Sequence, residues 1–105
     1  MARINDRQHR LEIVQFGRLL HEKGNWAEAE ALYREALRVF ETMSKRGSPQ
    51  LAEAQTNLAE ILVQTGNLNE AKSLKTDTLA MLQRIGDQEH PAVVSARSKL
   101  AALRL

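Results

Sequence analysis

The side chains that could carry out chemistry in this 105-residue chain are few and scattered. His9, His21 and His90 have no partner at the spacing of a metal-ligand pair, and the absence of cysteine removes thiolate nucleophiles and Cys-based zinc sites. Glu28 and Glu30 lie at an expected helix start, where negative charge favours the helix dipole. There is no Gly-rich phosphate loop and no Ser-His-Asp set. We therefore expect no enzyme activity, no metal and no cofactor.

The composition indicates one small domain, because 105 residues are too few for two ordinary ones. Hydrophobic residues make up 43%, enough for a modest core and too many for a disordered tail. No apolar run approaches the roughly 20 residues of a membrane helix, and the first residues lack the apolar stretch of a signal peptide. A net charge of +2 is too small to predict a nucleic-acid partner. The lack of cysteine fits a reducing compartment, so we expect a cytoplasmic protein. Because no apolar run is long enough for a membrane helix, we expect no membrane partner.

Glycine and proline are few and widely spaced, and they mark the breaks between helices. Between these breaks, apolar residues recur at spacings of three and four, which is typical of amphipathic helices. The connections are only a few residues long, so successive helices should run antiparallel. The sequence predicts five helices, at about residues 6–23, 26–45, 49–65, 68–85 and 90–104.

Two of the expected helix starts carry the same pair of residues. Asn25 and Glu28 have the spacing of a capping box, and Asn67 and Glu70 repeat it. Ser48 is the expected cap of the third helix. These caps predict sharp turns between the helices.

A shift of 42 residues relates the first part of the chain to the second, as from Gly24 to Gly66. The identities fall on turns, caps and small or apolar helix positions, so the match is more than a shared helical composition. The repeated unit is a pair of helices, present about two and a half times. The identical pairs are Leu20 and Leu62, Gly24 and Gly66, Asn25 and Asn67, Glu28 and Glu70, Ala29 and Ala71, Leu32 and Leu74, Leu37 and Leu79, Pro49 and Pro91, Ala54 and Ala96, Leu58 and Leu100, and Ala59 and Ala101.

These units resemble tetratricopeptide repeats. The first unit has Phe16-Gly17, Leu20, Gly24-Asn25-Trp26, Ala29, Tyr33 and Ala36. The second has Leu58-Ala59, Leu62, Gly66-Asn67-Leu68 and Ala71, but Lys75 and Thr78 replace the expected aromatic residue and alanine. The units resemble the kinesin light chain subclass in three features, which are the period of 42 residues, His90-Pro91 and Thr56-Asn57-Leu58-Ala59.

The resemblance implies an all-α fold, a right-handed α-α superhelix (solenoid) of antiparallel helix pairs. We divide residues 1–105 into a first unit at about 9–47, a second at about 48–88, and a half unit or capping helix at about 89–105.

The resemblance also implies a concave groove lined by the first helix of each unit. Such a groove suits an extended or helical peptide. The candidate groove residues are Leu11, Val14, Arg18, His21, Glu53, Thr56, Asn57, Glu60, Val63 and Lys99, with Ser95, Ser98 and Ala102 beside them.

Some tetratricopeptide domains clamp the acidic C-terminal tail of a chaperone, and this chain matches that clamp only in part. Asn57 and Lys99 fit two of its positions, whereas Val14 and Arg18 depart from it. Glutamates in the groove would also repel an acidic tail. We do not expect a chaperone-tail clamp, and a purely structural role for the Asn57 amide stays open.

The last predicted helix has no second helix to cover it. Val94, Leu103 and Leu105 are the candidates for self-association at this end, because repeat arrays need polar caps and this end is not conspicuously polar. A chain that is one piece of a longer array would explain the same apolar end.

The sequence therefore predicts a non-enzymatic scaffold that binds a protein or peptide in the groove. In this hypothesis Arg18, Asn57 and Lys99 hydrogen-bond the ligand, and Leu11, Val14 and Val63 supply apolar contact. The alternatives are a structural or homo-oligomerisation element that associates through the C-terminal helix, and a regulatory fragment of a larger protein.

Overall fold

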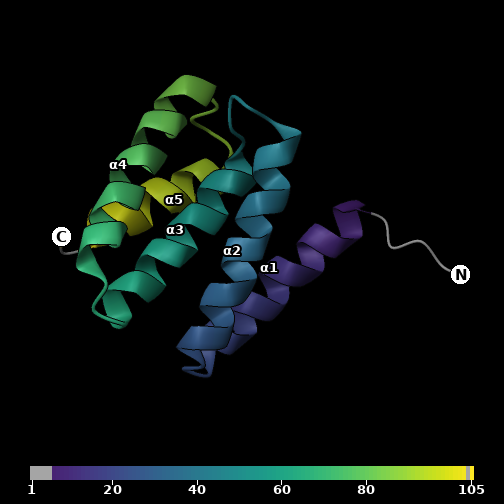
Figure 1. Cartoon of the computed structure of the whole chain (residues 1–105). Helices are drawn as coiled ribbons and strands as arrows, with labels where there is room; N and C mark the ends of the chain where they lie inside the picture. The colour runs from purple at the N-terminus through teal and green to yellow at the C-terminus, as the bar shows by residue number, and fades with distance from the viewer. Residues whose placement is uncertain (1–5, 104) are drawn as a thin grey trace, which may run out of the picture.

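The computed structural model describes residues 6–103 and 105, with the side chains of 6–12 and 14 outside the description. The described chain is all α-helical, which confirms the predicted fold class (Figure 1). Consecutive helices run in opposite directions, and every helix ends within about two residues of its predicted bound. The helices are α1 (Asp6–Glu22), α2 (Trp26–Met43), α3 (Pro49–Gln64), α4 (Leu68–Ile85) and α5 (Pro91–Ala102).

The turns after α1 and α3 have the same geometry. Gly24 and Gly66 adopt φ angles of 78° and 82°, in the left-handed region that favours glycine. The next backbone N–H in each turn, from Asn25 and Asn67, donates to the carbonyl oxygen of Leu20 and Leu62 at 2.8 Å. The residues that are identical at a spacing of 42 therefore build the same tight reversal twice.

The predicted capping boxes are wrong. Neither Asn25 nor Asn67 accepts a hydrogen bond from the start of its helix, because both have ψ near 65° rather than an extended backbone. The Asn67 amide instead donates to Glu70 Oε1 at 3.2 Å. The cap at Ser48 is confirmed, since its hydroxyl oxygen accepts from the N–H of Leu51 at 3.0 Å.

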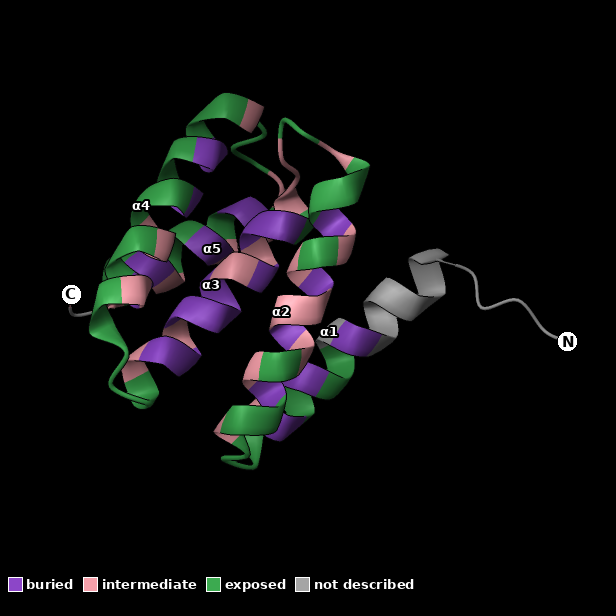
Figure 2. Ribbon diagram, in the orientation of Figure 1, coloured by how far each residue is buried: buried purple, intermediate pink, exposed green. Residues whose placement is uncertain are grey.

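The helices bury two apolar clusters, seen as the inward-facing buried positions in Figure 2. The first cluster joins the C-terminal half of α2 to α3, the end of α4 and α5, and its members include Phe40, Leu51, Met81, Leu82, Val93 and Leu100. The second cluster lies nearer the Gly24 and Gly66 turns, and its members are Leu20, Ala29, Tyr33, Leu58, Ile61, Leu62 and Ala71.

Helix α1 approaches α2 closely at one small residue. An added Cβ at Gly17 would meet the ring of Tyr33 at 3.2 Å, so glycine makes room for the aromatic ring. Forty-two residues later the pair is Ala59 and Lys75, and no ring has to be accommodated. Ala59 is fully buried, whereas the third member of the series, Ala101 on α5, is exposed. This difference shows that no described helix covers α5 at the position where α2 and α4 cover α1 and α3.

A charged contact links the two helix pairs across their outer helices. Arg34 of α2 pairs with Glu30 one turn earlier at 3.1 Å and with Glu70 in the first turn of α4 at 2.9 Å. Burial opposes the charge of Arg34, but the hydrogen bonds to Glu30 and Glu70 outweigh it and raise the pKa of the guanidinium group. The contact holds α2 and α4 together near the Gly24 and Gly66 turns.

Candidate functional site

Seven of the predicted groove residues that the structure describes come from α1, α3 and α5, the first helix of each pair, and we call this set the first-helix face. It comprises Arg18 and His21 of α1, Glu53, Asn57, Glu60 and Val63 of α3, and Lys99 of α5. Its clearest contact joins α3 to α5, where Lys99 Nζ donates to Asn57 Oδ1 at 3.4 Å. These two residues are 42 positions apart, so equivalent positions of successive first helices are neighbours in space.

Asn57 lies at the bottom of this face. Its side chain is only 3% exposed, and its Nδ2 atom has no hydrogen-bond partner among the described residues. A buried donor without a partner costs about 1–3 kcal/mol. Asn57 therefore holds an unused hydrogen-bonding group under the side chain of Lys99.

Thr56 does not share this surface. It is 1% exposed, and its hydroxyl donates to the carbonyl oxygen of Ala52 at 2.7 Å. This bond to the preceding helical turn satisfies the hydroxyl inside the protein. Thr56 contributes to packing, and we leave it out of the first-helix face.

His21 and the remaining predicted residues are placed as follows. The ring of His21 is half-buried and contacts the ring of Trp26 edge-on, with 5.2 Å between their centroids. Val63 packs against the second cluster. The side chains of Leu11 and Val14 lie outside the described residues, so their predicted apolar contacts stay predictions.

Tyr33 is a polar residue of this region that the sequence indicated only as a position of the repeat pattern. It is fully buried, and its hydroxyl group has no hydrogen-bond partner among the described residues. Burial raises the pKa of the Tyr33 phenol well above its usual range; the Arg18 guanidinium lowers it in part, and the carboxylates of Glu60, Glu53 and Glu22 raise it further. The phenol therefore stays protonated near neutral pH. The one signal in the sequence was a tyrosine opposite a helical glycine, and this pairing does not reveal that the tyrosine hydroxyl group lacks a partner among the described residues.

The charges around Tyr33 define the electrostatics of the first-helix face. Arg18 on α1 and Lys99 on α5 are cationic, and Glu53 and Glu60 on α3 lie between the two helices that carry them. Alternating charge of this kind suits a ligand with both donors and acceptors, such as a peptide backbone, better than one with a single charge sign.

Of the candidates for self-association, Val94 lies in the first turn of α5, and Leu103 and Leu105 follow the helix. Val94 is 53% exposed, in agreement with the expectation that it remains uncovered. Leu103 packs against the first cluster and Leu105 against the second, and both are half-buried. Val94 is therefore the member of the trio that is open to a partner.

Two further properties of the described residues bear on function. Within residues 6–103 and 105, no group of three or more histidine or acidic side chains is arranged to hold a metal ion. None of the helices in the same part of the chain is long and apolar enough to cross a membrane.

Comparison with known families agrees with the fold. The family model described as Tetratricopeptide repeat matches residues 10–84, which is more than half of the chain. The chain belongs to the tetratricopeptide repeat family, whose repeats commonly mediate protein–protein interaction and are generally non-catalytic. No curated protein and no solved structure matches the chain. The kinesin light chain subclass stays a prediction, because the family match does not distinguish it.

Proposed function

We propose that this protein is a non-enzymatic scaffold that binds a peptide segment on its first-helix face. The observation that carries the proposal is Asn57, a buried amide whose Nδ2 has no partner among the described residues and whose Oδ1 accepts from Lys99 at 3.4 Å. That distance lies beyond the usual range of an N–H···O hydrogen bond, so the contact is weak.

The proposed binding step begins with Lys99. Its side chain moves off Asn57 to a carbonyl or carboxylate group of the ligand, which uncovers the amide beneath. An asparagine amide offers one acceptor and two donors, which match the N–H and C=O groups of a peptide backbone. Arg18 then supplies a second cation from α1, while Glu53 and Glu60 accept from N–H groups or basic side chains of the ligand.

The test starts from a random peptide library selected on the full chain. Replacing both Arg18 and Lys99 with alanine should weaken the selected peptides about tenfold or more, because two charged hydrogen bonds are lost. The matched control removes the same charges from exposed sites on the second helices, with Arg38→Ala and Lys72→Ala, and should leave affinity unchanged. Fluorescence anisotropy measures both. Equal losses in the test and control variants would contradict the site, and circular dichroism checks that each variant is folded.

A second candidate function, homo-oligomerisation through α5, is favoured by one observation, the exposed Val94. We expect the chain to self-associate as its concentration rises and Val94→Lys to keep it monomeric, because a charge at an apolar interface loses its hydration. Leu79→Lys, at an exposed apolar position of α4, is the control and should not change the oligomeric state. Static light scattering measures the molar mass. A wild-type monomer at the highest soluble concentration would contradict this candidate.

The alternative of a regulatory fragment of a larger protein stays a prediction, as do the cytoplasmic location and the division into two and a half units. The sole support for a cytoplasmic location is that the sequence contains no cysteine.

A further inference from the structure

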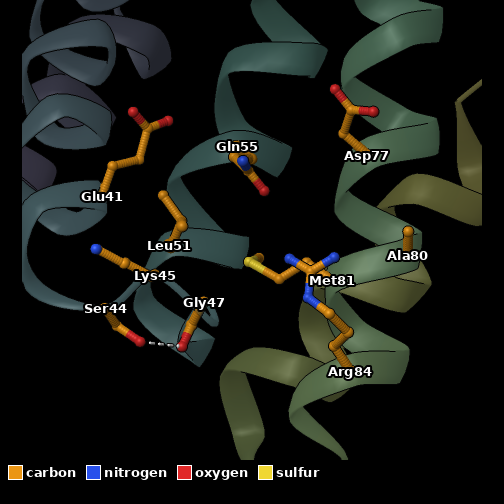
Figure 3. A pocket seen from close by; sticks show the side chains of 10 residues that line it. All are labelled: Glu41, Ser44, Lys45, Gly47, Leu51, Gln55, Asp77, Ala80, Met81 and Arg84. Carbon is orange, nitrogen blue, oxygen red and sulfur yellow. Dashed lines mark hydrogen bonds between the residues drawn. The ribbon is translucent and has the colours of Figure 1, made fainter.

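A cleft of about 340 Å³ lies between α2 and α4, away from the first-helix face (Figure 3). Its floor includes Leu51 and Gln55 of α3 and the buried side chain of Met81. Its volume is at the lower end of the range of small-ligand sites, about 300–1,000 Å³. The cleft is large enough for a few side chains of a partner.

The cleft is open because the residues around its lower end are small. Gly47 has no side chain and Ala80 has only a methyl group. The Ser44 hydroxyl donates to the carbonyl oxygen of Gly47 at 2.9 Å, a contact that Figure 3 draws as a dashed line. Gly47 and Ala80 therefore add little or no side-chain volume to the lining.

Each wall of the cleft carries an acidic residue followed by a basic one. On the first wall these are Glu41 of α2 and Lys45 just after it, and on the second they are Asp77 and Arg84 of α4. Helices α2 and α4 run in the same direction, so the two carboxylates share one end of the cleft (Figures 1 and 3). The Arg84 guanidinium group lies further along the cleft beside Met81, whereas the Lys45 side chain points away from α4 (Figure 3). The cleft is therefore dipolar along its length.

These charges are not used inside the protein. Glu41, Lys45 and Asp77 form no ion pair with another described residue. Arg84 Nε donates to the Arg46 carbonyl oxygen at 3.4 Å, and the terminal nitrogens of its guanidinium group have no partner among the residues described. A ligand with charges of opposite sign at the right spacing would pair with groups that are otherwise only hydrated.

The spacing of the charges limits the ligand. The Cα atoms of Asp77 and Arg84 are two turns of α4 apart, or about 10 Å at 1.5 Å per residue. The Arg84 side chain points back along the helix to Met81, which brings its charge nearer to Asp77 (Figure 3). In an extended peptide, residues i and i+2 point to the same side about 7 Å apart, and long charged side chains span the remainder. Their aliphatic stems would lie over Met81 and Leu51.

We propose that this cleft binds an extended peptide segment that places a lysine or arginine side chain at Glu41 and Asp77 and, two residues away, an acidic side chain at Arg84. The charged walls of this binding surface are separate from the first-helix face, although α3 contributes to its floor. The chain would thus contact two segments, or two parts of one partner, from different sides.

The probe for this proposal is a set of capped tripeptides, with acetyl-Arg-Ala-Glu-amide as the dipolar member. The chain has three methionines, and only Met81 lines the cleft, so methyl-labelled methionine gives a local NMR signal. The dipolar peptide should shift the Met81 methyl signal and leave that of Met43 in place. In three control peptides, two glutamines, two arginines or two glutamates replace the charged pair. Each should bind at least about fivefold more weakly than the dipolar peptide, because at least one good ion pair is lost.

Variants of the cleft complete the experiment. The double variant Glu41→Gln, Asp77→Asn should weaken binding of the dipolar peptide about fivefold or more. Ala80→Leu should fill the cleft and abolish the shift of the Met81 signal. Lys72→Ala is the control and should leave binding unchanged. Glu41, Asp77 and Ala80 are exposed helix positions, so these chains should fold normally, as circular dichroism will verify. The proposal is overturned if Met81 does not respond to the dipolar peptide, if the neutral peptide binds equally well, or if the carboxylate variant binds as the wild type does.

Discussion

Tyr33→Ala is expected to lower the free energy of unfolding by about 4 kcal/mol, whereas Tyr33→Phe should raise it by up to about 1 kcal/mol. The ring is fully buried between α1 and the second cluster, and Gly17 opposite it has no side chain that could fill the space. Alanine therefore leaves a cavity. Phenylalanine keeps the ring and removes a buried hydroxyl group that has no hydrogen-bond partner among the described residues.

Urea denaturation followed by circular dichroism measures both variants. Lys75→Ala is the matched control, because Lys75 occupies the equivalent position of α4 and is half-buried, and its change should stay within about 0.5 kcal/mol. A loss of more than 1 kcal/mol in Tyr33→Phe would contradict the interpretation. Such a result would mean that the hydroxyl group has a partner in solution, such as an ordered water.

The helix pairs were predictable because their signals are local. Gly24 and Gly66 mark reversals that only a positive φ allows, and apolar residues at spacings of three and four fill the segments between them. The 42-residue shift then predicted which positions would be equivalent, and the Asn57–Lys99 contact between neighbouring helices agrees with that alignment.

Details that depend on side-chain rotation or on the gap between helices were not predictable. The capping boxes failed because the spacing of Asn25 and Glu28 does not fix the ψ angle of Asn25, and that angle turns the amide away from the helix start. Thr56 and Asn57 are adjacent in sequence, yet one bonds to its own helix and the other reaches α5. Which neighbour packs inward depends on the rotation of α3 about its axis.

The cleft between α2 and α4 was missed for a related reason. Its walls come from residues that no motif joins. Its existence depends on the separation of α2 and α4, which the pair of Arg34 with Glu70 links near the Gly24 and Gly66 turns. Gly47 is one of the glycines that mark the breaks between helices. The structure adds that it lies against Met81, 34 residues later.

Gly47→Ala is expected to destabilise the protein by about 3 kcal/mol, more than alanine at any other positive-φ glycine. Gly47 has a φ of 108°, which costs a residue with a side chain about 1–2 kcal/mol. An added Cβ would also overlap the Cγ and Sδ atoms of Met81, which is buried in the first cluster. Overpacking of this kind costs a further 1–3 kcal/mol, roughly.

The control and the suppressor separate these two costs. Gly24, Gly66 and Gly86 also have positive φ, but a Cβ there would meet nothing within 4 Å, so alanine at each should cost only about 1–2 kcal/mol. Met81→Ala removes the overlap, so in that background Gly47→Ala should cost about as much as the control substitutions. Thermal unfolding of the single and double variants gives the coupling energy between the two sites. If the effects of Gly47→Ala and Met81→Ala are additive, the Met81 side chain moves into the neighbouring cleft at no cost. The whole loss of stability in Gly47→Ala would then come from the backbone conformation at residue 47.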